Sequence, residues 1–297
     1  MRKLYICGVL TILWLATVAA CAHGGKLVEG SSQNLTAKAD AALELARARP
    51  TRTRFWLAQE FSLREGVAID SVPGVSGIAT GKLGEFETKR AGLFLLYEPD
   101  AATIVDLKIL SLDRDPDVGG LPVFWVERAG DEESLELLRR VLRSNPSGAV
   151  AQQAVVAVAL HDEASVPTLL QQIVRDARDV PVRATAVSWL GRLPGQADLL
   201  AGLVRDEREP ADVRHAAVTA IAKGREPASL PTLESLYRAL ADKELKAHII
   251  RTVAKSEDKG AASEFLIRVA ESEPDESLRQ QALTSINKKL YRRKGKK

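Results

Sequence analysis

The chain has 297 residues, of which 45% are hydrophobic and 27% are charged, a composition that excludes wholesale disorder. The formal net charge of +3 hides an asymmetry, because residues 288–297 carry seven Lys and Arg and no acid. Without these ten residues the net charge is −4, so the body is mildly acidic and ends in a basic tail.

Residues 1–20 have the layout of a secretory signal peptide. Arg2 and Lys3 precede an uncharged and mostly apolar run, residues 4–20, that ends in small residues. A permanent transmembrane anchor is the alternative, but seventeen residues that include Gly8 and Thr11 lie at the short end of the membrane-spanning range. We therefore expect export with removal of this segment.

The end of the apolar run, residues 18–21, resembles the lipobox of bacterial lipoproteins, in which the cysteine is lipidated and becomes the first residue. The resemblance implies lipidation at Cys21, and Ala22 after it is associated with the outer membrane and a periplasm-facing protein. The only other cysteine, Cys7, lies inside the signal, so the mature chain forms no internal disulfide. Cleavage after Ala22, which gives a soluble periplasmic or secreted protein, is the alternative.

The next two segments are predicted to be a tether and a helix. Residues 21–35 are rich in Gly, Ser and Asn and form a flexible tether that reaches about 20 Å. Thr36 is a suitable N-cap for a helix over residues 36–49, which Pro50 ends.

Residues 50–128 are predicted to form a small antiparallel β region of about four to six strands. Apolar and polar residues alternate with a period of two in several stretches, which is typical of strands. The stretches expected to be strands are 55–63, 86–89, 93–97, 105–109 and 123–127.

Residues 129–297 are predicted to be helical and repetitive. The aligned anchor residues, spaced by 32, 31, 32 and 33 positions, are Val150, Val182, Val213, Leu245 and Leu278. The residues four, five and eight positions after every anchor are apolar, and an earlier apolar position marks a second helix in each unit. Five helix pairs at a period near 32 predict an α-solenoid and a mostly α fold.

Residues 179–191 and 212–221 resemble HEAT repeats, specifically the short bacterial subtype first named for phycobilisome lyases, and residues 276–283 are a fainter copy. The resemblance extends over about residues 131–290. It implies a right-handed curved solenoid whose concave face is built from the helices that carry the anchors. Because the family is mostly a scaffold, it implies a non-catalytic protein without a cofactor that binds a protein or peptide partner on this face.

A basic residue follows every anchor from the second onward, and an acid precedes it. The basic residues are Arg183, Arg214, Lys246 and Arg279, and the acids are Asp179, Asp212, Glu244 and Glu276. One interpretation is a basic ladder for an anionic partner on the concave face. The interpretation we favour is a stack of charge pairs between neighbouring repeats, each worth about 1 kcal/mol or less, because the acids neutralise the row.

Three histidines lie on or at the end of the anchored helices, and stacking of the repeats can bring His215 and His248 together. In helical-repeat hydroxylases that resemble this fold, His-Glu pairs bind two irons, but here no His is followed by Glu, and the nearest case is His161-Asp162. We therefore expect no metal site, and surface or interfacial histidines. The candidate partner-binding residues are Trp189, Arg183, Arg214, His215, Lys246 and His248.

Asp113, Asp115 and Asp117 alternate before two glycines, which suggests an acidic calcium loop as an alternative. The EF-hand pattern needs Gly where Val118 stands and a bidentate acid where Phe124 stands, so a hairpin turn is favoured.

The chain carries no recognisable catalytic motif. Residues 74–82 contain glycines without the phosphate-loop pattern, and the nucleophile motif Gly-x-Ser-x-Gly does not occur. Two other functions stay open: an enzyme site in the β region, and attachment to an anionic envelope polymer through the basic tail. Nucleic acid is not an expected partner because the protein is predicted to be exported.

Overall fold

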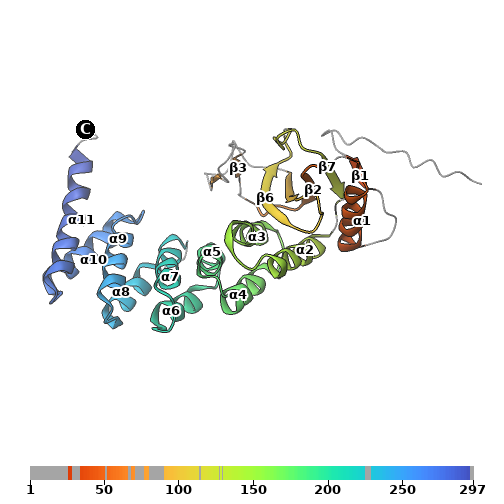
Figure 1. Ribbon diagram of the computed structural model, residues 1–297. Helices are drawn as coiled ribbons and strands as arrows, with labels where there is room; N and C mark the ends of the chain where they lie inside the picture. Colours follow the sequence, from red (N-terminus) through yellow and green to blue (C-terminus); the bar gives the residue numbers. More distant parts are fainter. Residues whose placement is uncertain are drawn as a thin grey trace, which may run out of the picture.

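The computed structural model describes residues 26–28, 34–50, 52–65, 68–70, 77–79, 90–113, 115–126, 128, 130–224 and 229–294. The predicted signal, Cys21, most of the tether and the expected strand over 86–89 lie outside these residues. A helix and a small sheet are followed by a curved array of helices (Figure 1). None of the described helices is both long enough and apolar enough to cross a membrane.

The first helix, α1 (Leu35–Arg47), packs on the sheet. Its N-cap is Asn34, whose side-chain oxygen accepts a hydrogen bond of 3.0 Å from the amide of Ala37, so the expectation of Thr36 as the cap is wrong. The cap lies two residues earlier because Leu35 is already buried as part of the apolar side of the helix.

The main sheet has the strand order β1-β7-β2-β5-β6. Its strands are β1 (Lys26–Val28), β2 (Phe55–Phe61), β5 (Ala91–Tyr97), β6 (Ile104–Ser111) and β7 (Val123–Val126). The strands β2, β5 and β6 pair antiparallel, as expected, but β7 pairs parallel to β2 and to β1, so the sheet is mixed. Two short strands, β3 (Ala68–Asp70) and β4 (Gly77–Ala79), pair with each other.

Both faces of the sheet are apolar. One face continues the core of the helical array through residues such as Phe55, Leu93 and Leu95. The other face holds a second cluster in which Phe94 makes edge contacts with Trp56 and Trp125, with ring centroids 6.2 and 5.4 Å apart. Burial on both sides explains why β5 and β7 are continuous apolar runs rather than alternating ones.

The described helices beyond the sheet form five pairs, which confirms the predicted number. They are α2 (Asp131–Ser144), α3 (Gly148–Leu160), α4 (Val166–Asp176), α5 (Val180–Leu190), α6 (Ala197–Arg205), α7 (Ala211–Lys223), α8 (Ser229–Ala239), α9 (Lys243–Val253), α10 (Lys259–Ser272) and α11 (Glu276–Lys294). The inner helices α3, α5, α7, α9 and α11 carry the anchors and lie on the concave side of the arc, and the outer helices α2, α4, α6, α8 and α10 lie on its convex side (Figure 1).

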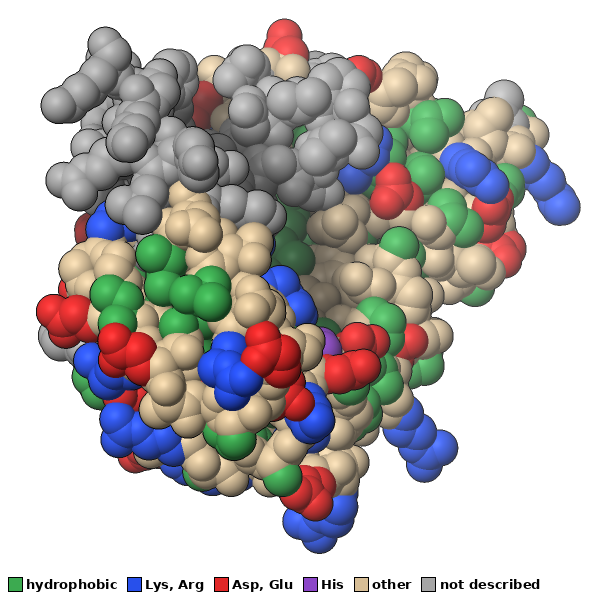
Figure 2. Space-filling model, turned by 90° about the vertical axis from the view of Figure 1, so that its left-hand side faces the viewer, with side chains coloured by type: hydrophobic (Ala, Val, Ile, Leu, Met, Phe, Trp, Pro, Cys, Tyr) green, Lys and Arg blue, Asp and Glu red, His purple; other side chains and the backbone are tan. Residues whose placement is uncertain are grey.

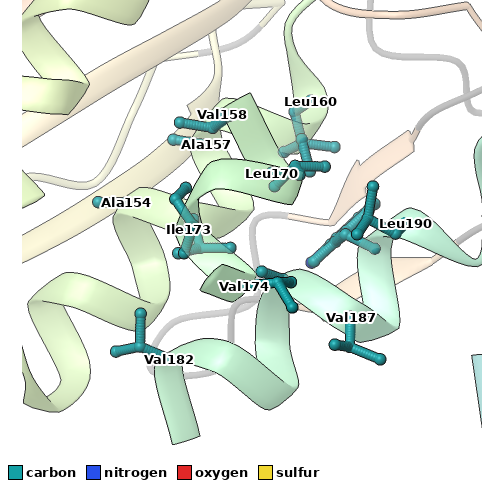
Figure 3. Packing of buried hydrophobic residues seen from close by; sticks show 14 of the residues in the cluster. Ala154, Ala157, Val158, Leu160, Leu170, Ile173, Val174, Val182, Val187 and Leu190 are labelled. Atoms are coloured by element: carbon teal, nitrogen blue, oxygen red, sulfur yellow. The ribbon is translucent and has the colours of Figure 1, made fainter. Parts of the chain in front are cut away.

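The anchors and the apolar residues that follow them form one continuous core. Leu170 and Val174 of α4 lie together with Val182 and Leu190 of α5 (Figure 3). Successive inner helices also pack directly on one another. At Gly191 the approach to α7 is so close that an added Cβ would stand 2.6 Å from the Cβ of Ala220.

A polar junction joins the sheet to the first helix pair. The amide of Arg64 donates to the carbonyl of Leu160 at 2.9 Å, and the amide of Asp162 donates to that of Ser62 at 3.2 Å. The β region therefore covers α3 and closes the first end of the array.

Candidate interaction surface on the concave face

The inner helices leave one side unpacked, which we call the concave face. Helix α7, for example, packs on α5, α6, α8 and α9. At about 100° per residue, the positions three, six and ten after an anchor point away from the core. In α5, α7 and α9 these positions are Thr185, Ser188, Arg192, Ala216, Thr219, Lys223, His248, Arg251 and Lys255, and all of them are exposed or half-buried.

Figure 2 shows the molecule from the α11 end, with a hollow in its middle. Basic, acidic and histidine side chains lie along the lower wall of this hollow. The face is therefore polar, in contrast to the apolar core on the other side of the same helices.

The basic residues that follow the anchors form a ladder between repeats. Arg183 donates to the carbonyl of Val174 at 2.7 Å and to the carboxylate of Glu209 at 2.7 Å. Each of these bonds has a different role, because Val174 belongs to the outer helix of the same pair and Glu209 precedes the inner helix of the next pair. The arginine thus connects two repeats.

The same arrangement recurs in the next two pairs. Arg214 donates to the carbonyl of Val204 at 3.0 Å and to Asp242 at 2.9 Å, and Lys246 lies 3.1 Å from Glu273. The side chains of Arg183, Arg214 and Lys246 are only 16%, 9% and 16% exposed. Their donors are used inside the array, which disfavours a direct contact with a partner.

Charge pairs between repeats are therefore confirmed, but of the predicted acids only Glu276 pairs with its predicted basic residue, Arg279, and that pair lies within one helix. Asp179 does not pair with Arg183 and instead caps α5 by accepting from the amide of Val182 at 2.9 Å. An acid just before the anchor lies at the N-terminus of its own helix, whereas the basic side chain points to the next pair. At the last pair Arg279 binds the carbonyls of Glu273 and Pro274.

His215 and His248 stack on each other, with ring centroids 4.6 Å apart, as predicted from the repeat spacing. The Nε2 atom of His248 lies 3.0 Å from the hydroxyl of Thr219. Burial lowers the pKa of His248, and its interactions with His215, Arg251 and Lys255 lower it further. The concave face is thus locally positive at α9.

Trp189 lies where the β region meets the concave face. Its side chain is buried, and the guanidinium of Arg192 lies over its ring, 4.1 Å from the centroid. Burial lowers the pKa of Arg64, and the charge of Arg192 adds to this effect while Asp162 opposes it. Arg64 of the β region and Arg192 of the helical array are therefore close enough for the charge of one to affect the other.

The sequence interpretation missed a set of exposed cations on this face. The residues ten positions after the anchors of α5, α7 and α9 are Arg192, Lys223 and Lys255, which we call the cationic row, and Lys288 follows at the same spacing. None of the three forms an ion pair with a residue that the structure describes. The alignment of the repeats ends eight positions after each anchor, and comparison of the residues two positions further on reveals the cationic row.

A serine and a histidine are hydrogen-bonded in the junction. The Nδ1 atom of His161 lies 2.7 Å from the carbonyl of Ala157, so it carries the proton and Nε2 accepts from the hydroxyl of Ser134 at 2.7 Å. Ser134 in turn accepts from the amide group of Gln59 at 2.6 Å. Burial lowers the pKa of His161 to about 4.

Ser134 and His161 are arranged like a nucleophile and its general base, but both side chains are enclosed in the core. Both side chains are 1% exposed, and the ring of Phe61 stacks on His161 with centroids 4.2 Å apart. A substrate cannot reach a hydroxyl that is enclosed in this way. The chain Gln59–Ser134–His161 therefore holds the sheet on the first helix pair.

The acidic loop forms a turn. Asp117 accepts from the amide of Gly119 at 2.9 Å, and Gly119 and Gly120 adopt positive φ angles of 65° and 68°. Among the residues that the structure describes, no three His, Cys, Asp or Glu side chains are placed to hold a metal ion, and Asp113 and Asp115 join no such group.

Comparison with known proteins supports the repeat assignment. The family model of HEAT repeats matches residues 166–239 and 196–287, which extend from α4 into α11. No curated protein and no solved structure shows a significant match to the chain. Residues 166–287 of the helical array therefore contain HEAT repeats, in agreement with the predicted resemblance.

Proposed function

We propose that this HEAT-repeat protein is a non-catalytic scaffold of the bacterial cell envelope that holds a protein or peptide partner on its concave face. The observation that carries the proposal is the face itself. Polar and cationic side chains stand in register from α5 to α9, on helices whose other sides are packed in the core. HEAT repeats commonly bind protein partners, and extended solenoid surfaces suit this role.

The inner helices are held rigidly relative to one another, which favours binding. The ladder ties each pair to the next, and the contact of Gly191 with Ala220 leaves little space between α5 and α7. A preformed surface loses less conformational entropy on association than a flexible one, so a modest number of contacts can give useful affinity.

The β region limits where the partner binds. It covers α3 and closes the first end of the array, so α5 is the first inner helix with an open side. We place the partner along α5, α7, α9 and α11. Arg192, which lies over the ring of Trp189, marks one end of this surface.

The cellular location is the second part of the proposal, and it rests on the sequence alone. The apolar run at residues 4–20 and the lipobox-like residues 18–21 support export and lipidation at Cys21. Ala22 favours the outer membrane. We also assign the repeats to the short bacterial subtype, on the pattern of residues 179–191, and this subtype supplies no catalytic residue.

The anchor is tested by comparing Cys21→Ser with Cys7→Ser. We expect the wild type and Cys7→Ser to be found in the membrane fraction with a mass that begins at an acylated Cys21. The Cys21→Ser protein should lose this retention. Cys7→Ser is the matched control because it removes a thiol from the segment that is cleaved away. A wild-type product that is soluble and begins after Ala22 would contradict the anchor.

The scaffold is tested by blocking the concave face. Ser188 is exposed on this face, and Ser235 is exposed on the outer helix α8. We expect Ser188→Trp to release a partner that co-purifies with the wild type, and Ser235→Trp to retain it. Retention by both variants, or release by Ser235→Trp alone, would contradict binding at the concave face.

A further inference from the structure

The cationic row has a regular geometry. Arg192, Lys223 and Lys255 lie at or just after the C-terminal ends of α5, α7 and α9. Packed helices are about 8–10 Å apart, so neighbouring members of the row begin about this far from each other. The short contact between Gly191 and Ala220 places α5 and α7 at the close end of this range.

A cation at the end of a helix interacts favourably with the helix dipole, which is the simplest reason for such a residue. Four of the five outer helices show the same preference, and α10 is the exception. Their last-turn arginines are Arg143, Arg175, Arg205 and Arg238. The dipole therefore explains one cation per helix, but not the grouping of further positive residues beside the inner row.

This grouping distinguishes the concave face. Arg64 lies near Arg192, and Arg251 lies near His248 and Lys255. On the outer side Arg143 and Arg238 are neutralised by Glu136 and Glu234, whereas Arg175 and Arg205 form no ion pair with a described residue, so the concave face differs in its further cations and its curvature rather than in the helix-end cations themselves.

Cations that converge in a hollow surface add their fields, and such a surface attracts negative charge. Burial is the largest cause of the lowered pKa of His248, and the proximity of Arg251 and Lys255 lowers it further, as expected beside such a group of cations. The body of the protein has a net charge of −4 without its last ten residues, so the attraction is local to this face.

We propose that the partner presents an extended acidic peptide segment, which lies across α5, α7 and α9 with its carboxylates on Arg192, Lys223 and Lys255. This inference rests on the proposed scaffold function and names the chemistry of its partner. A chain in the extended polyproline II conformation rises about 3.1 Å per residue with three residues per turn, so side chains three positions apart lie on the same side and about 9 Å from each other, which is the spacing of neighbouring cations. Asp or Glu at every third position therefore matches the row.

The other side chains of the face suit a peptide backbone. Ser188 and Thr219 lie on the same side of α5 and α7 as the row, one turn before Arg192 and Lys223. Their hydroxyls can donate to and accept from peptide groups. A flat membrane surface cannot follow a concave face, so the row is built for a chain rather than for lipid headgroups.

The test uses the full chain and a fluorescein-labelled peptide of about twelve residues with Glu at every third position and Ser between. Fluorescence anisotropy at low salt measures its affinity. We expect the triple variant Arg192→Gln/Lys223→Gln/Lys255→Gln to bind about tenfold to a hundredfold more weakly than the wild type. Binding by the wild type should also weaken as salt is added.

The matched control is Arg175→Gln/Arg178→Gln/Arg205→Gln. These arginines are exposed at the ends of the outer helices α4 and α6, form no ion pair with a described residue, and change the net charge by the same amount. We expect this variant to bind the peptide as the wild type does. Equal losses in both variants, or no loss in the first, would overturn the assignment of the row. Circular dichroism is used to check that both variants are folded.

Two further outcomes separate the possible ligands and the two proposals. A single-stranded oligonucleotide of equal charge that binds more tightly than the peptide, and depends on the row, would overturn the assignment to a peptide. Release of the co-purifying partner by Ser188→Trp, but not by the triple variant, would overturn this inference and leave the scaffold function standing. Retention of that partner by Ser188→Trp would instead overturn the scaffold function.

Discussion

His161 makes the junction between the sheet and the helical array sensitive to acid. Burial lowers its pKa from an ordinary value of 6.5 to about 4, so in the folded protein the ring stays neutral until the pH is low. In the unfolded chain it binds a proton near pH 6.5. Protonation therefore favours the unfolded chain, and the stabilisation present at neutral pH is lost as the pH falls from about 6.5 to about 4.

The magnitude follows from the difference between the two pKa values. One unit corresponds to about 1.36 kcal/mol, so the loss from this residue is about 2 kcal/mol at pH 5 and about 3 kcal/mol at pH 4. The substitution that isolates it is His161→Gln, which does not titrate and keeps a polar group opposite Ser134. Other groups titrate in the same range, but they are common to both proteins.

The assay is urea denaturation at about pH 7.5 and about pH 5, in a Trp189→Phe background. Trp56 and Trp125 lie in the sheet, so their fluorescence reports unfolding of the region that His161 holds. We expect the wild type to lose about 2 kcal/mol more than His161→Gln between the two pH values. Equal losses would show that His161 has the same pKa in the folded and the unfolded chain and would refute the reasoning.

Two further substitutions test the packing of the repeats. Arg214→Met removes the bonds to Val204 and Asp242, so we expect the free energy of unfolding to fall by about 2–3 kcal/mol. The control is Arg205→Met, at an exposed arginine that forms no ion pair with a described residue. It should change the free energy of unfolding by less than about 0.5 kcal/mol. Urea denaturation followed by circular dichroism measures both, and similar losses would remove the ladder as a source of stability. Gly191→Ala brings a methyl group to 2.6 Å from the Cβ of Ala220 and 2.7 Å from its carbonyl oxygen, so it should destabilise the array by about 1–3 kcal/mol. Gly202→Ala, in open space on α6, should stabilise it by about 0.5–1 kcal/mol, and a gain in thermal stability for both variants would contradict the close approach of α5 and α7.

The repeats were predictable because their core positions are independent of any partner. Val182, Val213 and Leu245 recur at nearly constant spacing since each is buried against the same neighbours in its own pair. The same regularity predicts that His215 and His248 lie close together, and their rings stack. Periodicity thus predicts both the core and contacts between equivalent positions of neighbouring pairs.

The features that escaped prediction depend on three-dimensional geometry or lie at repeat positions outside the apolar pattern. The strand β7 pairs parallel to β2, and an apolar run does not encode the direction of pairing. The acid that receives Arg183 stands 26 residues later, at a distance set by the offset between pairs. The cationic row lies beyond the last core position of each helix, where hydrophobic periodicity gives no signal.

The most direct test of the concave face as the binding surface is site-specific photo-crosslinking in cells that produce the full chain. A photoreactive phenylalanine replaces Ser188 on the concave face or Ser235 on the outer side, both of which are exposed. We expect one adduct of defined mass from position 188 and none from position 235. An adduct from position 235 in the absence of one from position 188 would contradict binding at the concave face.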